Sequence, residues 1–118
     1  MSKSAAVRSA FRQFLLRLER NLEPDKVILF GSRARGRYRR TSDFDLLVVS
    51  RKFRGVPWIK RAPMVIRLWD IPLDIEPICL TPEELKRRSD ELSIVGEAVR
   101  HGVEVHARRG HAVRAPRI

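Results

Sequence analysis

Two aspartates with the spacing of metal ligands lie near the middle of the chain, in the segment SDFDLLVV. Asp43 and Asp45 enter an apolar run that predicts a β-strand continuing to Val49. Because strand side chains alternate between faces, both carboxylates project to the same side of a sheet. Two neighbouring anions beside apolar residues repel each other and require a compensating cation. Magnesium prefers oxygen ligands and often binds substrate phosphates as well, so the pair points to a nucleotide.

A turn suited to phosphate binding precedes this strand. Residues 27–30 predict a short apolar strand that ends at Gly31. Glycine lacks a Cβ, so the backbone can turn sharply and a phosphate can approach its N–H closely. Ser32 offers a hydroxyl at the start of a short helix expected from Arg33, where unpaired N–H groups favour an anion. If the two strands are neighbours, a phosphate cradle lies beside the metal site.

Each motif also has a purely structural explanation. Residues 41–43 are of types that form a polar turn before a strand. Gly31 and Ser32, taken alone, would be an ordinary turn at a strand end. The polar turn does not explain Asp45, a charged residue where an apolar strand favours an uncharged one. The combination therefore favours a site over two unrelated turns.

The order of these motifs resembles a known family. A strand, the GS turn, an arginine-rich segment and a strand-borne SDFDL follow one another as in the DNA polymerase beta superfamily of nucleotidyltransferases. Within it, GSRARG followed by SDFDLLV is similar to the minimal nucleotidyltransferase (MNT) branch. Many MNT proteins are prokaryotic antitoxins paired with a HEPN-domain toxin. The resemblance spans residues 25–106 and implies a polymerase-beta-like fold, ATP as the substrate and a site for two Mg²⁺ ions.

The resemblance also implies a third carboxylate. Residues 69–80, WDIPLDIEPICL, predict a third strand with Asp74 and Glu76 on one face. The family places its third acid early in this strand, so Asp74 is expected and Glu76 is the reserve. By the same resemblance, Asp43 and Asp45 would bridge the metals that bind the triphosphate. Asp74 would join them at the metal that activates the attacking hydroxyl.

The chain is strongly basic, with a formal net charge of +11 and a pI near 11.3. Arg35 matches the family's GSxARG motif, which implies that it binds the triphosphate through its guanidinium fork. A solvated or partner-facing basic surface is at least as well supported for the neighbouring arginines, which are Arg33, Arg37, Arg39 and Arg40. The charge would also attract nucleic acid, but the aromatic residues form no stacking array. An acidic protein partner would answer the same charge.

The periodicity predicts one α/β (α+β) domain, with a small mixed β-sheet of about four strands packed against helices. It comprises residues 1–107, and residues 108–118 form a basic, flexible tail. Besides the strands above, we expect an amphipathic helix over 7–22, a helix over 58–69 that Pro63 interrupts or delays, a capped helix from Pro82, a helix over 92–101 and a strand over 103–106.

The 118 residues leave no room for a separate acceptor-binding domain. The acceptor must therefore be bound through a partner or a homo-oligomer. No apolar segment is long enough to span a bilayer or to serve as a signal, so a cytoplasmic protein is expected. Cys79 is expected to be a buried core residue, and the three histidines lack the spacing of a zinc site.

Three functions follow as hypotheses. The first is transfer of a nucleoside monophosphate, AMP from ATP by resemblance, to a hydroxyl of a HEPN-type partner protein, as in a type VII-like antitoxin. The second is an antitoxin that neutralises its partner by binding alone. The third is nucleotidyl transfer to RNA or a small molecule, which the missing acceptor domain disfavours.

Overall fold

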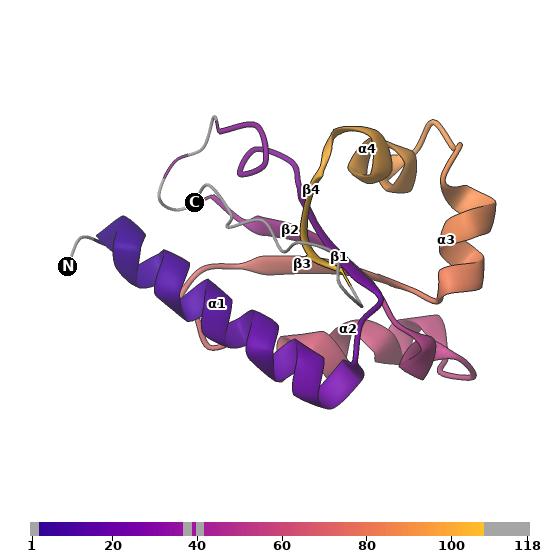
Figure 1. Cartoon of the computed structure of the whole chain (residues 1–118), viewed down its shortest axis with the longest axis horizontal. Helices are drawn as coiled ribbons and strands as arrows, with labels where there is room; N and C mark the ends of the chain where they lie inside the picture. Colours follow the sequence, from indigo (N-terminus) through magenta and orange to yellow (C-terminus); the bar gives the residue numbers. More distant parts are fainter. Residues whose placement is uncertain (1–2, 37–38, 40–41, 108–118) are drawn as a thin grey trace.

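The computed structural model describes residues 3–36, 39 and 42–107. These residues form four α-helices and four β-strands, which are labelled in Figure 1. In chain order the elements are α1 (Lys3–Leu22), β1 (Lys26–Phe30), β2 (Phe44–Val49), the 3-10 turn η1 (Arg51–Phe53), α2 (Trp58–Ile66), β3 (Ile75–Leu80), α3 (Pro82–Arg88), α4 (Ile94–His101) and β4 (Val103–Ala107).

The four strands form one mixed sheet in the order β3-β2-β1-β4. β1 runs antiparallel to both of its neighbours, whereas β2 and β3 are parallel and are joined by the crossover through α2. The register places Asp45 opposite Phe30, the last residue of β1, and opposite Glu76 near the start of β3. The expected mixed sheet of about four strands is confirmed. Its central strands carry the predicted turn and the predicted aspartates.

Helices cover both faces of the sheet, with α1 and α2 on one side and α3 and α4 on the other (Figure 1). The α1/α2 side holds the larger apolar cluster, which includes Phe14, Leu18, Leu46 and Val48. The smaller cluster on the α3/α4 side includes Leu47 and the helix residues Val95 and Ala98. Since β2 alternates between these clusters, Asp45 belongs to the face covered by α3 and α4.

An aromatic cluster anchors β2 from the α1/α2 side. The ring of Phe44 stacks on Phe11 with centroids 5.1 Å apart, and Trp69 meets Phe44 edge-on at 5.1 Å and Phe14 at 4.8 Å. The Trp69 indole N–H donates to the carbonyl of Leu73 at 2.7 Å. Because Phe44 lies between the two aspartates in sequence, this packing fixes the position of the strand that carries them.

Most expected helices form, with differences at their ends. The capped helix is confirmed, since Thr81 and Glu84 make a reciprocal capping box around Pro82. The helix expected over 58–69 is α2, which ends at Ile66 and keeps Pro63 inside it. The short helix expected from Arg33 is wrong, because residues 31–36 form turns and Gly36 has a positive φ of 74° that helical backbone cannot follow.

Cys79 is buried, as expected, and burial raises the pKa of its thiol to about 12. This thiol is therefore unsuited to act as a nucleophile. Within the described ranges no helix has the length and apolar character needed to cross a membrane. The predicted basic tail, residues 108–118, lies outside the described residues.

Candidate active site

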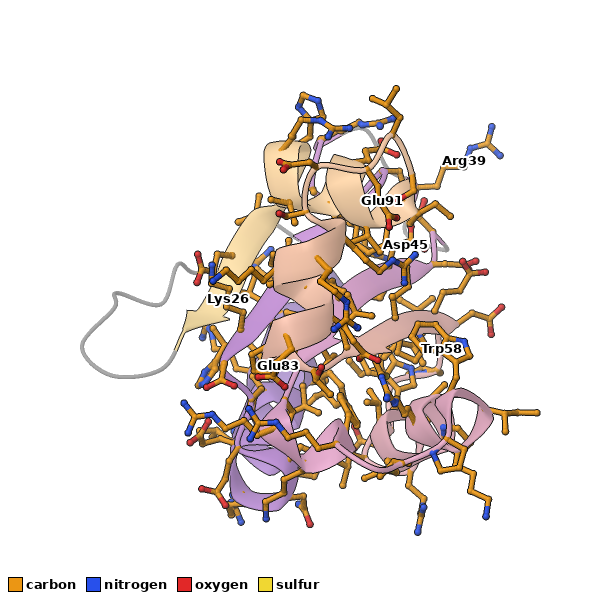
Figure 2. All side chains as sticks on the ribbon, turned by 90° about the vertical axis from the view of Figure 1, so that its right-hand side faces the viewer. Lys26, Arg39, Asp45, Trp58, Glu83 and Glu91 are labelled. Carbon is orange, nitrogen blue, oxygen red and sulfur yellow. The ribbon has the colours of Figure 1, made fainter. Side chains whose placement is uncertain are left out.

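The aspartate pair lies at the entry to β2. Asp43 comes immediately before the strand, and Asp45 is its second residue. Phe44 between them is fully buried on the α1/α2 side, so Asp45 projects to the opposite face, where it is half-buried. Figure 2 shows Asp45 at the same end of the molecule as Glu91, and far from Glu83. The site therefore occupies one end of the sheet.

Gly31 packs directly against the carboxylate of Asp45. Its φ is +75°, in the left-handed region that favours glycine, and it follows β1 immediately. A Cβ at this position would lie 2.3 Å from Oδ2 of Asp45, far inside contact distance. The structure thus brings together the two motifs that the sequence predicts as neighbours. Ser32 follows Gly31 in the same turn and is half-buried.

The third acid of the site, Glu76, is in contact with Asp45. It lies opposite Asp45 in the parallel register, and the two carboxyl groups share a side-chain hydrogen bond. Asp74 precedes β3 and is exposed, and its backbone carbonyl accepts the N–H of Phe44 at 2.9 Å. β3 therefore begins at Ile75, one residue after Asp74, whereas the sequence predicts a strand that includes Asp74. Its first carboxylate inside the sheet is Glu76.

The environment of Asp45 disfavours a negative charge. Burial is the largest cause, followed by the hydrogen bond and charge of Glu76, and then by the charges of Asp43 and Glu97. Together they raise the pKa of Asp45 from its usual 3.8 to about 6. A carboxyl group with this shift, beside a glycine turn, is typical of a functional site.

Arg33 and Arg35 have different roles, although they lie one residue apart. Arg33 is buried, its Nε donates to the carbonyl of Ser42 at 3.0 Å, and its guanidinium lies 4.1 Å from the centroid of the Phe44 ring. The expected basic-surface role for Arg33 is therefore wrong, because this buried side chain links the turn to Ser42 and Phe44 at the start of β2. Neither charge nor spacing in the sequence separates it from its neighbours.

Arg35 points to the other side and pairs with a residue that the sequence does not single out. Its Nη2 forms an ion pair with Oε1 of Glu97, in the first part of α4. Its backbone N–H donates to the carbonyl of Gly31 at 3.3 Å, which closes the turn. Glu97 escapes sequence analysis because it lies in an ordinary amphipathic helix. Only the fold brings it to the turn.

Carboxylate oxygens are the type of ligand that a hard divalent cation prefers. Within the described parts of the chain, no three or more His, Cys, Asp or Glu residues converge closely enough to hold a metal by themselves. Two carboxyl groups, those of Asp45 and Glu76, nevertheless meet there, and the surroundings of Asp45 disfavour its negative charge. Such a pair suits Mg²⁺, which is commonly held by one or two carboxylates together with substrate phosphates.

Comparison with known proteins agrees with this geometry. Residues 10–105 match the family described as "Nucleotidyltransferase domain". The chain belongs to this nucleotidyltransferase family. A protein of Methanocaldococcus jannaschii named "Putative protein adenylyltransferase MJ0141" is 32% identical over 84 residues, which cover 69% of this chain and 78% of the relative.

Solved structures give the same result for the fold. The crystal structure of a protein from Sulfolobus solfataricus, titled as a putative nucleotidyltransferase, has a TM-score of 0.52 and 31% identity and covers 92% of this chain and 91% of its own. BolA1 from Arabidopsis thaliana has a TM-score of 0.53 at 22% identity, covering 64% of this chain and 94% of its own. The BolA1 likeness concerns the fold alone. The nucleotidyltransferase assignment is carried by the family match and by the relatives above 30% identity.

Proposed function

We propose that this nucleotidyltransferase is metal-dependent and transfers a nucleoside monophosphate, AMP from ATP, to a hydroxyl group of a partner protein. The observation that carries the proposal is the half-buried Asp45, with Gly31 packed on one side and Glu76 on the other. The surroundings disfavour the negative charge of this carboxyl group, and a bound cation would compensate it. The name of the M. jannaschii relative supports protein as the acceptor class.

The residues divide the work by their chemistry. Asp43, Asp45 and Glu76 would hold Mg²⁺. When bound, this ion would neutralise the charge that develops on the phosphates and would make the attacking hydroxyl more acidic. The backbone N–H of Gly31 and the hydroxyl of Ser32 suit the phosphate oxygens. Arg35, on the same turn, adds a guanidinium. The entering hydroxyl bonds to the α-phosphorus as the bond to pyrophosphate breaks, and its proton passes to a carboxylate or to solvent.

The third acid can be assigned by a direct comparison. The family pattern favours Asp74, whereas the register and the hydrogen bond to Asp45 favour Glu76. We expect Glu76→Gln to lower kcat by at least about a hundredfold, since it removes the charge of the group that is hydrogen-bonded to Asp45. Asp74→Asn is expected to have a smaller effect, because Asp74 lies before the strand and is not among the groups that raise the pKa of Asp45. Exposure does not separate the two acids, since Glu76 is exposed as well. The reverse order would assign the role to Asp74.

The proposed biological setting is that of an MNT antitoxin. In it the acceptor is a HEPN-type toxin, and transfer of AMP to its tyrosine side chain neutralises it. The GSRARG and SDFDLLV segments support this reading through their resemblance to the MNT branch.

The test is label transfer. The purified protein is incubated with Mg²⁺, α-labelled ATP and the partner, beside an Asp43→Asn/Asp45→Asn variant, and intact mass identifies the modified chain. A gain of one AMP on the partner that requires both carboxylates supports the proposal. A stable complex without transfer, with neutralisation retained in the variant, would instead establish binding as the means of neutralisation. Label on RNA or on a small molecule would redirect the acceptor class.

A further inference from the structure

The ion pair between Arg35 and Glu97 joins the phosphate turn to the far end of the chain. The two residues are 62 positions apart in sequence. Arg35 belongs to the turn that begins at Gly31, and Glu97 is the fourth residue of α4. Their side chains are 58% and 40% exposed, so solvent and an incoming ligand can reach both. The Arg35–Glu97 pair is therefore accessible to solvent, on the face of the sheet that carries Asp45.

The backbone that carries Glu97 is fixed by close packing. A Cβ at Gly102, directly after α4, would lie 2.3 Å from Cγ2 of Ile28 in β1. A Cβ at Gly96 would lie 1.7 Å from the carbonyl oxygen of Glu91. Val95 on the same helix is buried against the sheet. This packing fixes the backbone position from which the Glu97 side chain reaches Arg35.

The pair leaves most of the guanidinium available. Glu97 accepts from Nη2 of Arg35, whereas a guanidinium carries five N–H donors arranged in a planar fork. One edge can therefore hold Glu97 while the other binds a phosphate oxygen. Glu97 also lies within electrostatic range of the metal-binding carboxylates, because its charge is one of the influences on Asp45.

We propose that Glu97 is a positioning residue, which orients the guanidinium of Arg35 toward the phosphates of the bound nucleotide. This inference rests on the proposed nucleotidyl transfer. Arginine is a long side chain with many rotamers, and on an exposed turn it would otherwise spend little time in the productive orientation. Glu97 restricts it before the nucleotide arrives. The benefit is realised as the charge on the departing pyrophosphate develops.

The inference predicts different effects on binding and on turnover. In Glu97→Gln the site gains one unit of positive charge, so KM for ATP should stay constant or fall by up to about fivefold. The same variant loses the charge that orients Arg35, so kcat should fall by about tenfold. A residue that merely stabilised the fold would not produce this combination. Glu97→Asp keeps the charge but is shorter, and should recover part of kcat.

The experiment combines a double-mutant cycle with a matched control. KM for ATP and kcat are measured by transfer of label from α-labelled ATP for wild type, Glu97→Gln, Arg35→Ala and the double variant, and Mg-ATP binding is measured by calorimetry. If Glu97 acts through Arg35, the double variant has the kcat of Arg35→Ala alone. The control, Glu83→Gln, breaks an ion pair of similar exposure with Arg54 far from Asp45 (Figure 2) and should leave kcat and KM unchanged.

Each outcome decides between the two proposals. Absence of Mg-ATP binding and of transfer in wild type would overturn the proposed function and this inference with it. Transfer in wild type with an unchanged kcat in Glu97→Gln would overturn the inference alone. Additive losses in the double variant would also overturn it, because Glu97 would then act independently of Arg35. Circular dichroism of every variant confirms that the comparison is made between folded proteins.

Discussion

The substitution Asp45→Asn should make the ligand-free protein more stable at neutral pH, although it removes a central residue of the site. In the folded chain the pKa of Asp45 is raised from 3.8 to about 6. The folded state therefore binds the proton more tightly than the unfolded state does. Ionisation of this group costs no stability below pH 3.8, costs progressively more as the pH rises through about 6, and reaches its full cost above that.

The magnitude follows from the shift. One pKa unit corresponds to about 1.4 kcal/mol, so the rise would correspond to about 3 kcal/mol if the group were shielded from water. Asp45 is only half-buried. Solvent screening reduces the value to about 1 kcal/mol. Asparagine has nearly the same shape, can still donate to Glu76 and carries no charge, so it should recover this free energy. For a domain of this size, the gain corresponds to a rise in Tm of roughly 3–6 °C.

The assay is thermal unfolding in the presence of EDTA at pH 7.5 and at pH 4. We expect the stabilisation of Asp45→Asn at pH 7.5 and little difference at pH 4, where the wild-type carboxyl is largely protonated. Asp70→Asn makes the same chemical change at an exposed ion pair with Arg17 and should not raise Tm. The reasoning would be refuted if Asp45→Asn were no more stable at pH 7.5, or if its gain were the same at both pH values. Mg²⁺ with ATP should reverse the order by stabilising wild type alone.

Three further predictions concern the residues that build the site and its support. Gly31→Ala should lower the free energy of unfolding by about 2–4 kcal/mol and abolish Mg-ATP binding. Gly36 has a similar φ of +74°, but among the described residues no atom lies within 4 Å of the new Cβ, so Gly36→Ala should cost only about 1–2 kcal/mol of backbone strain. Urea unfolding would measure the difference in stability, and calorimetry the difference in Mg-ATP binding. Arg33→Ala should cost about 2–3 kcal/mol in the same unfolding measurement, since it removes a buried cation that packs on an aromatic ring. The pKa of Glu84 is lowered chiefly by its hydrogen bond with Arg61. Glu84→Gln should therefore destabilise the protein at pH 7, and the destabilisation should disappear as the pH falls below the usual Glu range. Thermal unfolding across this pH range would test the prediction.

Much of the site could be predicted because its motifs are local. The residue type of Gly31 predicts a turn, and that of Asp45 marks a charged position in a strand. The fold then places the two residues in contact. The capping box at Thr81 is equally local and is confirmed. The alternation of β2 correctly separates Phe44 from the aspartates.

What the sequence could not predict depends on contacts between distant segments. The ion pair of Arg35 with Glu97 requires α4 to return to the first strand, which no local pattern specifies. The burial of Arg33 depends on the position of the Phe44 ring. The choice between Asp74 and Glu76 depends on the register of β3 against β2, because a shift of two residues would place Asp74 instead of Glu76 opposite Asp45 on the same face of the sheet.

The unequal division of the core has a dynamic consequence. The cluster under α1 and α2 contains 15 buried residues, whereas the cluster under α3 and α4 contains 7, and the acid site lies on the side of the smaller cluster. Less apolar area opposes the local opening of that layer, so amides of α3 and α4 should exchange with deuterium faster than those of β1 and β2. Nucleotide bridging the turn and α4 would slow this exchange. We therefore expect the layer beside the candidate site to open locally while the aromatic cluster on the other face keeps the sheet intact.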